Sequence, residues 1–132
     1  MRGSATSSTI GATELPNHRL EPPASSVRSY LAPACGGGSG AALAATEVTF
    51  EPGGYVSEHH HVGPHIVFVL SGELTSVLNG KTTVYKAGEY FYEPGNVTHA
   101  AFNKTSLPLV VIGFDILPAE WKGRAVLPPK SQ

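Results

Sequence analysis

The chain has 132 residues, of which 41% are apolar and 14% are charged, and its formal net charge is −1. This length suits one domain with a buried core, and the composition excludes both a disordered acidic chain and a basic nucleic-acid binder. No window approaches the ~18 apolar residues of a membrane span, so we expect a soluble protein, cytoplasmic unless a leader has been removed. The single cysteine, Cys35, has no partner for an internal disulfide.

Glycine and proline are abundant, with 15 and 11 copies. Together with many Val, Thr, Tyr and Phe residues, they are typical of short strands interrupted by frequent turns. The composition therefore predicts an all-β fold.

Residues 1–40 are rich in Ser, Thr, Ala, Gly and Pro and end in the glycine-rich stretch Gly36–Gly40. They contain too few bulky apolar side chains to fold alone, so we predict an extended N-terminal arm. Within it, Ser26–Leu31 has the composition of an edge strand, added either to this domain or to a second subunit.

Residues 41–118 carry the pattern of a folded β-domain, with eight short runs of strand character at intervals of about ten residues. The expected strands are Leu43–Phe50, Tyr55–His61, His65–Ser71, Glu73–Leu78, Lys81–Tyr85, Glu89–Glu93, Val97–Phe102 and Leu107–Ile116. Asn79–Gly80 predicts a tight hairpin, because both residues tolerate the positive φ of a type I′ turn. Regular short strands favour a sandwich or a barrel, and the jelly roll is the eight-stranded choice.

Residues 119–132 are predicted to be a C-terminal tail. The best candidate for any helix is a single turn at Ala119–Arg124, which follows Pro118. Trp121 is interpreted as a lid or packing residue.

Four of the six histidines lie between residues 59 and 65. Residues two apart on a strand share a face, so His59 and His61 point one way and His60 points the other. Two imidazoles on one face can chelate one divalent transition metal ion, such as Fe, Mn, Ni, Cu or Zn. We expect His60 to pack against its surroundings or to form hydrogen bonds.

Two further histidines extend this pair. His65 follows a bend at Val62–Pro64 that can return it to the same ion, and the alternative is a buried imidazole bonded to a backbone group. His99 belongs to the second half of the chain, where a strand of a small barrel can lie opposite the first half. The predicted metal ligands are His59, His61, His65 and His99.

The same residues resemble the two sequence motifs of the cupin family. The first motif is Gly, five residues, His, one residue, His, three or four residues, Glu, six residues, Gly. Its matches here are Gly53, His59, His61 and Gly72, with His65 at the position of the Glu.

The second motif is Gly, five residues, Pro, one residue, Gly, two residues, His, three residues, Asn. Its matches are Gly88, Pro94, His99 and Asn103, with Asn96 in place of the internal Gly. Asn also tolerates the left-handed conformation. Eight of ten defined positions therefore match between Gly53 and Asn103.

The resemblance implies a cupin-type jelly-roll β-barrel with one metal ion inside it, held by His59, His61, His65 and His99. Four neutral imidazoles would leave the ion its full charge, which favours an anionic bidentate ligand. A general base would then come from outside the ligand set. Glu93 is the candidate, with Tyr90, Tyr92 and Glu58 behind it, and the alternative is that Glu93 is a solvated carboxylate at the edge.

The resemblance further implies a metal-dependent enzyme acting on a small organic molecule in the barrel, with a non-heme dioxygenase as the leading hypothesis. The alternatives are a Lewis-acid isomerase, cyclase or lyase, and a non-catalytic metal- and ligand-binding protein. We expect no nucleic-acid or membrane partner. We also expect a homodimer, because the apolar strands Ile66–Leu70 and Leu109–Ile116 and the N-terminal arm need cover.

Overall fold

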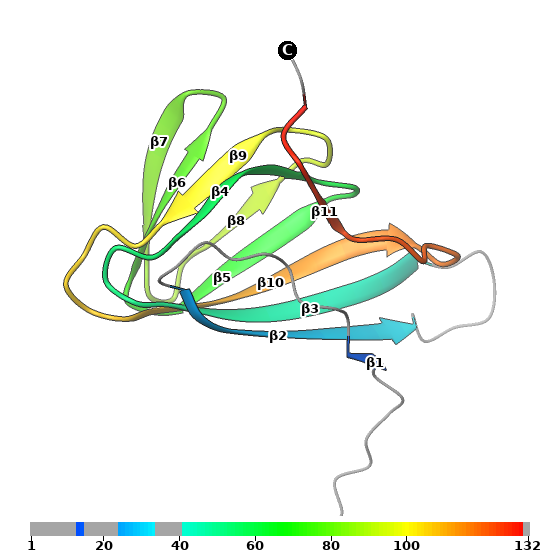
Figure 1. The fold of residues 1–132 in the computed structure, drawn as a ribbon, viewed down its shortest axis with the longest axis horizontal. Coiled ribbons are helices and arrows are strands. Elements are labelled where there is room, and N and C mark those ends of the chain that lie inside the picture. The colour runs from blue at the N-terminus through cyan, green and yellow to red at the C-terminus, as the bar shows by residue number, and fades with distance from the viewer. Residues whose placement is uncertain (1–12, 15–23, 34–40, 131–132) are drawn as a thin grey trace, which may run out of the picture.

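The computed structural model describes residues 13–14, 24–33 and 41–130, which form strands and turns but no helix (Figure 1). The strands belong to two antiparallel sheets, a six-stranded sheet with the order β1-β2-β3-β10-β5-β8 and a five-stranded sheet with the order β11-β4-β9-β6-β7. The all-β prediction is confirmed.

The six-stranded sheet consists of β1 (Thr13–Glu14), β2 (Ala24–Pro33), β3 (Ala41–Phe50), β10 (Leu109–Pro118), β5 (His65–Ser71) and β8 (Tyr90–Glu93). The five-stranded sheet consists of β11 (Val126–Leu127), β4 (Tyr55–His61), β9 (His99–Phe102), β6 (Glu73–Leu78) and β7 (Lys81–Lys86). All eight strands expected between residues 43 and 116 are confirmed, with small differences at their ends.

The two sheets face each other in a jelly roll that is open rather than closed as a barrel. Within the described residues, no strand of one sheet forms a ladder with a strand of the other. The chain passes between the sheets at Gly72, where φ is +82° and a Cβ would lie 2.6 Å from the Pro108 carbonyl oxygen. Only glycine fits such a turn without displacing the backbone.

Two apolar clusters pack against the six-stranded sheet. One consists of Phe50, Val67, Val69, Leu74, Phe91, Leu109 and Val111, and the other of Ala42, Ala44, Leu117 and Ala125. Burial of each large apolar side chain stabilises the fold by roughly 1.5–3 kcal/mol. Along β10 the inward positions between the clusters are Gly113 and Asp115, and along β3 the position is Thr46. The interior therefore has a polar region flanked by apolar packing on both sides.

The turns follow their predicted chemistry. Asn79 and Gly80 have φ values of 49° and 72° and close the hairpin in which Leu78 is paired with Lys81. Asn96 has a φ of 65°, so it adopts the left-handed conformation in place of glycine.

The segments outside the predicted domain are partly attached to it. β2 pairs with β3 from Ala24 opposite Phe50 to Pro33 opposite Ala42, so the edge strand expected near Ser26–Leu31 joins this chain's own sheet. The rest of the predicted arm, including Cys35, lies outside the described residues. At the other end no helical turn forms over residues 119–124, and a turn bonded from the Trp121 N–H to the Pro118 carbonyl takes its place.

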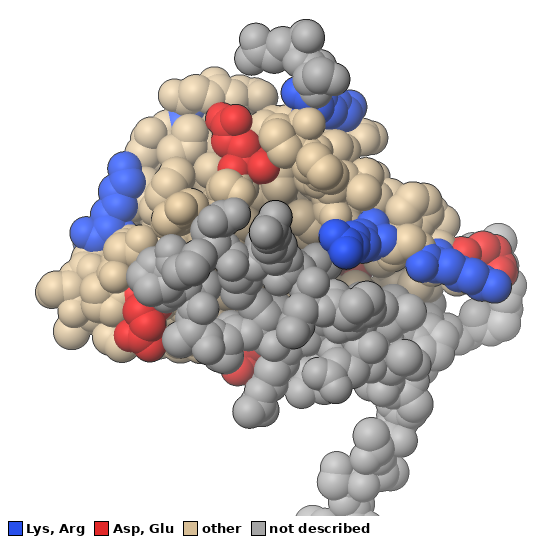
Figure 2. All heavy atoms as spheres, viewed as in Figure 1, with Lys and Arg blue, Asp and Glu red and all other residues tan. Residues whose placement is uncertain are grey.

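The outer face of the six-stranded sheet exposes apolar side chains, among them Phe68, Leu70, Tyr90 and Tyr92. The predicted homodimer remains a prediction. Among the described residues no helix is long and apolar enough to cross a membrane. On the face shown in Figure 2, the lysine and arginine side chains of the described residues are scattered rather than gathered in a patch.

Asn103 ties the loops at one end of the fold together. Its buried Nδ2 donates to the carbonyl oxygens of Phe50, Glu51 and Leu107 at 3.1, 3.2 and 2.8 Å. Its Oδ1 accepts hydrogen bonds from the N–H and the hydroxyl of Thr105 at 3.0 and 2.8 Å. One amide thereby satisfies backbone groups of two loops that are far apart in sequence.

We predict that Asn103→Ala destabilises the protein by roughly 2–4 kcal/mol, because several backbone carbonyls lose a donor in a buried setting. Urea unfolding would measure the loss. Ser106→Ala, an exposed change in the same loop, is the control and is expected to have no measurable effect. Equal stabilities of the two variants would contradict the role of Asn103.

Candidate metal centre

His65 lies between two acidic residues on neighbouring strands of the six-stranded sheet. In the register of β5 it is opposite Asp115 of β10 and opposite Glu93 of β8. All three side chains line the same cavity. The sheet thus presents a row of acid, imidazole and acid toward the interior.

The five-stranded sheet supplies imidazoles from the other side. His59 and His61 of β4 both line the cavity, as their spacing predicts, and His99 of β9 is paired with His59. The His61 and His65 rings stack with their centroids 3.8 Å apart, across the two sheets. Side chains from both sheets therefore meet at one point.

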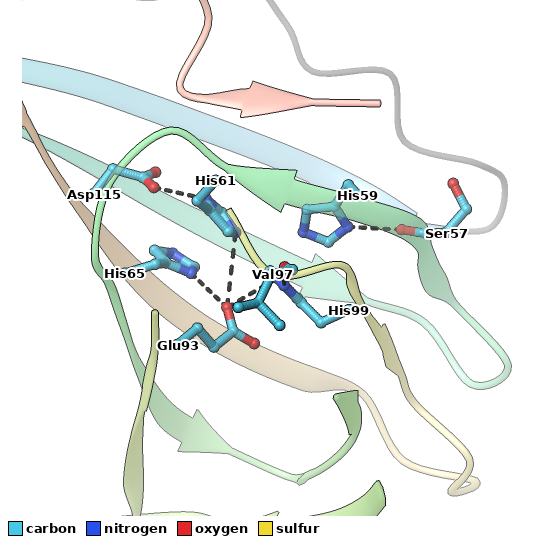
Figure 3. A network of polar contacts seen from close by, with 8 residues as sticks. All are labelled: Ser57, His59, His61, His65, Glu93, Val97, His99 and Asp115. Atoms are coloured by element: carbon cyan, nitrogen blue, oxygen red, sulfur yellow. Dashed lines mark hydrogen bonds and ion pairs between the residues drawn. The ribbon is translucent and has the colours of Figure 1, made fainter. Parts of the chain in front are cut away.

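The carboxylate of Glu93 lies at the centre of these imidazoles (Figure 3). Its Oε2 is 2.8 Å from His65 Nδ1, 2.9 Å from His99 Nε2 and 3.7 Å from His61 Nε2. The ligand atoms of the four residues all lie within 4.8 Å of one another. Glu93 is 3% exposed, so the alternative of a solvated carboxylate at the edge is wrong.

The other residues considered for proton transfer are exposed. Tyr90 and Tyr92 are 66% and 58% exposed, because they alternate with Phe91 and Glu93 along β8 and face outward. Glu58 is exposed and lines the cavity.

His59 lies beside the four-residue cluster. Its ring centroid is 4.2 Å from that of His99 and 5.1 Å from that of His61. Its Nδ1–H donates to the Ser57 carbonyl oxygen at 2.7 Å, which leaves Nε2 as an acceptor. The structure thus gathers three of the predicted ligands with Glu93 and places His59 next to them.

Asp115 is a site residue that the sequence patterns did not predict. It accepts a hydrogen bond of 2.6 Å from the Nδ1–H of His61, and both residues are buried. This contact fixes the tautomer and the ring orientation of His61, as a carboxylate does for many metal-binding histidines. An available signal was the position of Asp115 as the only charged residue in the apolar strand β10.

The residues present fit a metal ion. Because Nδ1 of His61 carries the proton, its Nε2 is a bare acceptor, and this buried atom has no hydrogen-bond partner. It faces the Glu93 carboxylate, another acceptor, at 3.7 Å. A cation between them can bind both acceptors. Without a cation, His61 Nε2 has no partner.

The charges at the site are strongly coupled. Burial lowers the pKa of His59 to about 3 and also lowers the pKa of His61. Burial raises the pKa of the Glu93 carboxyl, but hydrogen bonds from His65 and His99 outweigh it and hold that pKa below its usual range.

His99 shows the complementary effect. Burial lowers its pKa, but the hydrogen bond to Glu93 and the charge of that carboxylate outweigh burial, so its pKa is raised. Both of its nitrogens face acceptors, since Nδ1 is 3.0 Å from the Val97 carbonyl oxygen. The site therefore favours a positive charge beside Glu93, and a metal ion would displace the proton that His99 holds there.

The cluster opens into a cavity of about 390 Å³ between the sheets. Its other walls are mainly apolar and include Val48, Phe50, Val67, Leu74, Phe91 and Val111. Gly113 leaves room for the His65 ring, because a Cβ at this position would collide with His65 Nε2. Sequence spacing alone does not show this contact.

Comparison with known proteins identifies the same fold. A family model described as the cupin domain matches residues 46–116, which are 71 of the 132 residues. A crystal structure of a cupin superfamily protein from Desulfitobacterium hafniense has 17% identity and a TM-score of 0.57, over 81% of this chain and 98% of that chain. No curated protein matches the chain significantly.

Two enzymes are also similar in structure. An oxalate oxidase has 24% identity and a TM-score of 0.56, over 65% of this chain and 45% of that chain. A salicylate 1,2-dioxygenase from Pseudaminobacter salicylatoxidans has 22% identity and a TM-score of 0.52, over 55% and 20%. At these identities the similarity shows the fold alone. The family match over more than half of the chain, together with the jelly-roll sheets, shows that the chain belongs to the cupin family.

Proposed function

We propose that this cupin is a metal-dependent enzyme that acts on a small organic molecule between its two sheets, as an oxidoreductase of the dioxygenase type. The observation that carries this proposal is the buried cluster of His61, His65, Glu93 and His99 at the wall of an apolar cavity. Ligand sites typically combine such apolar walls with a few converging polar groups.

The proposed ligands are His61, His65, His99 and Glu93, with His59 beside them. One bound divalent transition metal ion would supply Lewis acidity and, for iron, copper or manganese, electrons for chemistry with O2. Asp115 holds the His61 ring in place through its hydrogen bond. The mainly apolar walls favour an apolar substrate.

Glu93 alters the charge expected from the sequence. Four neutral imidazoles would leave the ion its full double charge, whereas a carboxylate ligand reduces that charge. A less positive ion is a weaker Lewis acid and gives up an electron more readily. This difference supports the oxidoreductase over the isomerase, cyclase or lyase.

Two roles are proposed for His59, and one variant, His59→Ala, distinguishes them. Its Nε2 is unprotonated, because its Nδ1–H donates to the Ser57 carbonyl. It can complete the donor set, as the sequence predicts, or accept a proton from the substrate. His59→Ala loses tight metal binding in the first case and keeps metal but loses turnover in the second.

The non-catalytic binder remains the second candidate, because a fully protein-coordinated ion suits a structural site. The two similar enzymes are named an oxidase and a dioxygenase. Because their identity to this chain is low, measurement of metal content and O2 uptake decides between the enzyme and the binder.

We predict that Glu93→Gln and Asp115→Asn both weaken metal binding, by different amounts. Asp115→Asn should cost about 10–100-fold in affinity, as loss of a carboxylate that orients a ligand usually does. Glu93→Gln should cost more, because it removes the charge next to the ion. Titration of the apo-proteins with Zn²⁺ against a competing chelator would measure both losses.

The matched control is Glu58→Gln, which changes an exposed carboxylate at the same cavity and should leave the affinity unchanged. An affinity of Glu93→Gln equal to that of the unmodified protein would remove Glu93 from the ligand set.

We further predict that His99→Ala abolishes tight metal binding, whereas His60→Ala leaves the metal content unchanged. His60 is buried but is not among the residues that line the cavity. Elemental analysis of the purified variants would test this pair. Metal loss in the His60 variant would show that the assignment of strand faces is wrong.

For the activity, we predict that the purified protein contains iron, copper or manganese and consumes O2 with at least one β-dicarbonyl, catechol or flavonol-like compound. An oxygen electrode would record the uptake. His99→Ala is the control and should show none. Zinc as the native metal, with no uptake across the panel, would refute the dioxygenase and favour the binder.

A further inference from the structure

We infer that Arg124 binds the carboxylate of an organic acid whose apolar body fills the cavity and whose other end faces the histidine cluster. This inference names the substrate class of the proposed enzyme and, for the reaction itself, rests on that proposed function. Four sets of observations support it.

The first is the course of the chain after β10. The segment turns back at Pro118–Trp121, and β11 then pairs with β4, with Val126 opposite His61 (Figure 1). Between these points Arg124 lines the cavity. The C-terminal segment therefore forms part of the wall of the site.

The second is the anchoring of this segment on both sides of Arg124. The next residue, Ala125, is buried in the second apolar cluster, and its carbonyl accepts a 2.9 Å hydrogen bond from the Val62 N–H. On the other side, Trp121 Nε1–H donates to the Arg124 carbonyl at 3.2 Å. A Cβ at Gly123 would lie 3.0 Å from the Trp121 ring, so the indole packs closely on this turn. The backbone holds Arg124 at the cavity while its side chain is exposed.

The third is the charge balance of the cavity. Among the described residues that line it, Arg124 is the only lysine or arginine, and the acidic ones are Glu58, Glu93 and Asp115. Glu93 and Asp115 are hydrogen-bonded to histidines. In the described part of the chain, Arg124 forms no ion pair with an acidic side chain. Among the described residues, no acidic side chain therefore competes with a ligand for its guanidinium group.

The fourth is the shape and polarity of the space. A volume of about 390 Å³ is at the lower end of the range of ligand sites, roughly 300–1,000 Å³. Valine, leucine and phenylalanine side chains favour a hydrocarbon body, and the planar fork of arginine binds a carboxylate through two parallel hydrogen bonds. The matching ligand is a small acid with an aromatic or branched aliphatic body.

Isothermal titration calorimetry on the full, Zn²⁺-loaded chain would test this with two matched pairs, benzoate with benzamide and cyclohexanecarboxylate with cyclohexanecarboxamide. We expect each acid to bind more tightly than its amide. Arg124→Gln should weaken binding of the acids by about 10–100-fold, the loss expected for a charge-assisted pair, and leave the amides unchanged. Arg124→Lys should have an intermediate effect, because it keeps the charge without the fork.

Lys122→Gln is the matched control, since Lys122 is exposed in the same turn and is not a cavity-lining residue. It should bind the acids as the unmodified protein does. Equal binding of acid and amide, no binding of either acid, or undiminished acid binding by Arg124→Gln would overturn the inference. An acid bound only to the metal gives the last result.

The same samples separate this inference from the proposed function. If the acids bind through Arg124 but the purified protein has no redox metal and no O2 uptake, the enzyme proposal fails and the recognition stands. If metal and O2 uptake are present but the acids bind independently of Arg124, the recognition fails and the enzyme proposal stands.

Discussion

The polar part of the interior depends on the contacts between the Glu93 carboxylate and imidazoles from the two facing sheets. An ionised carboxylate buried without partners would destabilise the fold by several kcal/mol. His65 reaches it from the neighbouring strand and His99 reaches it from the opposite sheet, at 2.8 and 2.9 Å. Both sheets must therefore keep their relative position for the charge to stay paired. Because buried ion pairs rarely add net stability, the apolar cluster that includes Phe50, Val67 and Leu74 holds the two sheets together, and the polar cluster is best explained by its chemistry.

Local sequence patterns were sufficient to predict the elements of the fold. Strand alternation and turn residues act over a few positions, so the amino-acid sequence alone predicts the strands between residues 43 and 116 and the Asn79–Gly80 hairpin. The same holds for the common direction of His59 and His61, because it depends only on their spacing. The open edge between the sheets could not be predicted, since it depends on which strands pair, and most neighbouring strands are not consecutive in the chain.

The partners of the histidines required the register of the sheets. Glu93 is 28 residues from His65 and Asp115 is 54 residues from His61, and no local pattern relates such distant positions. Sequence alone therefore left Glu93 as a candidate base near the mouth and missed Asp115. The wall formed by Arg124 was missed for a related reason, because the segment after Pro118 has neither strand nor helix periodicity until β11 pairs with β4.

The exchange at position 65 shows how spatial position differs from position in a motif. By resemblance, His65 stands where the cupin motif has glutamate, which suggested a site without a carboxylate. Glu93 lies directly opposite His65 on the adjacent strand β8, and its side chain points to the same interior. In the proposed site, β8 supplies the carboxylate that β5 lacks, so the charge of a three-imidazole, one-carboxylate set is kept while its source strand changes. A metal ion responds to the donor atoms around it rather than to their order along the chain, so Glu93 can replace the motif glutamate as the carboxylate donor while His65 supplies one of the three imidazoles.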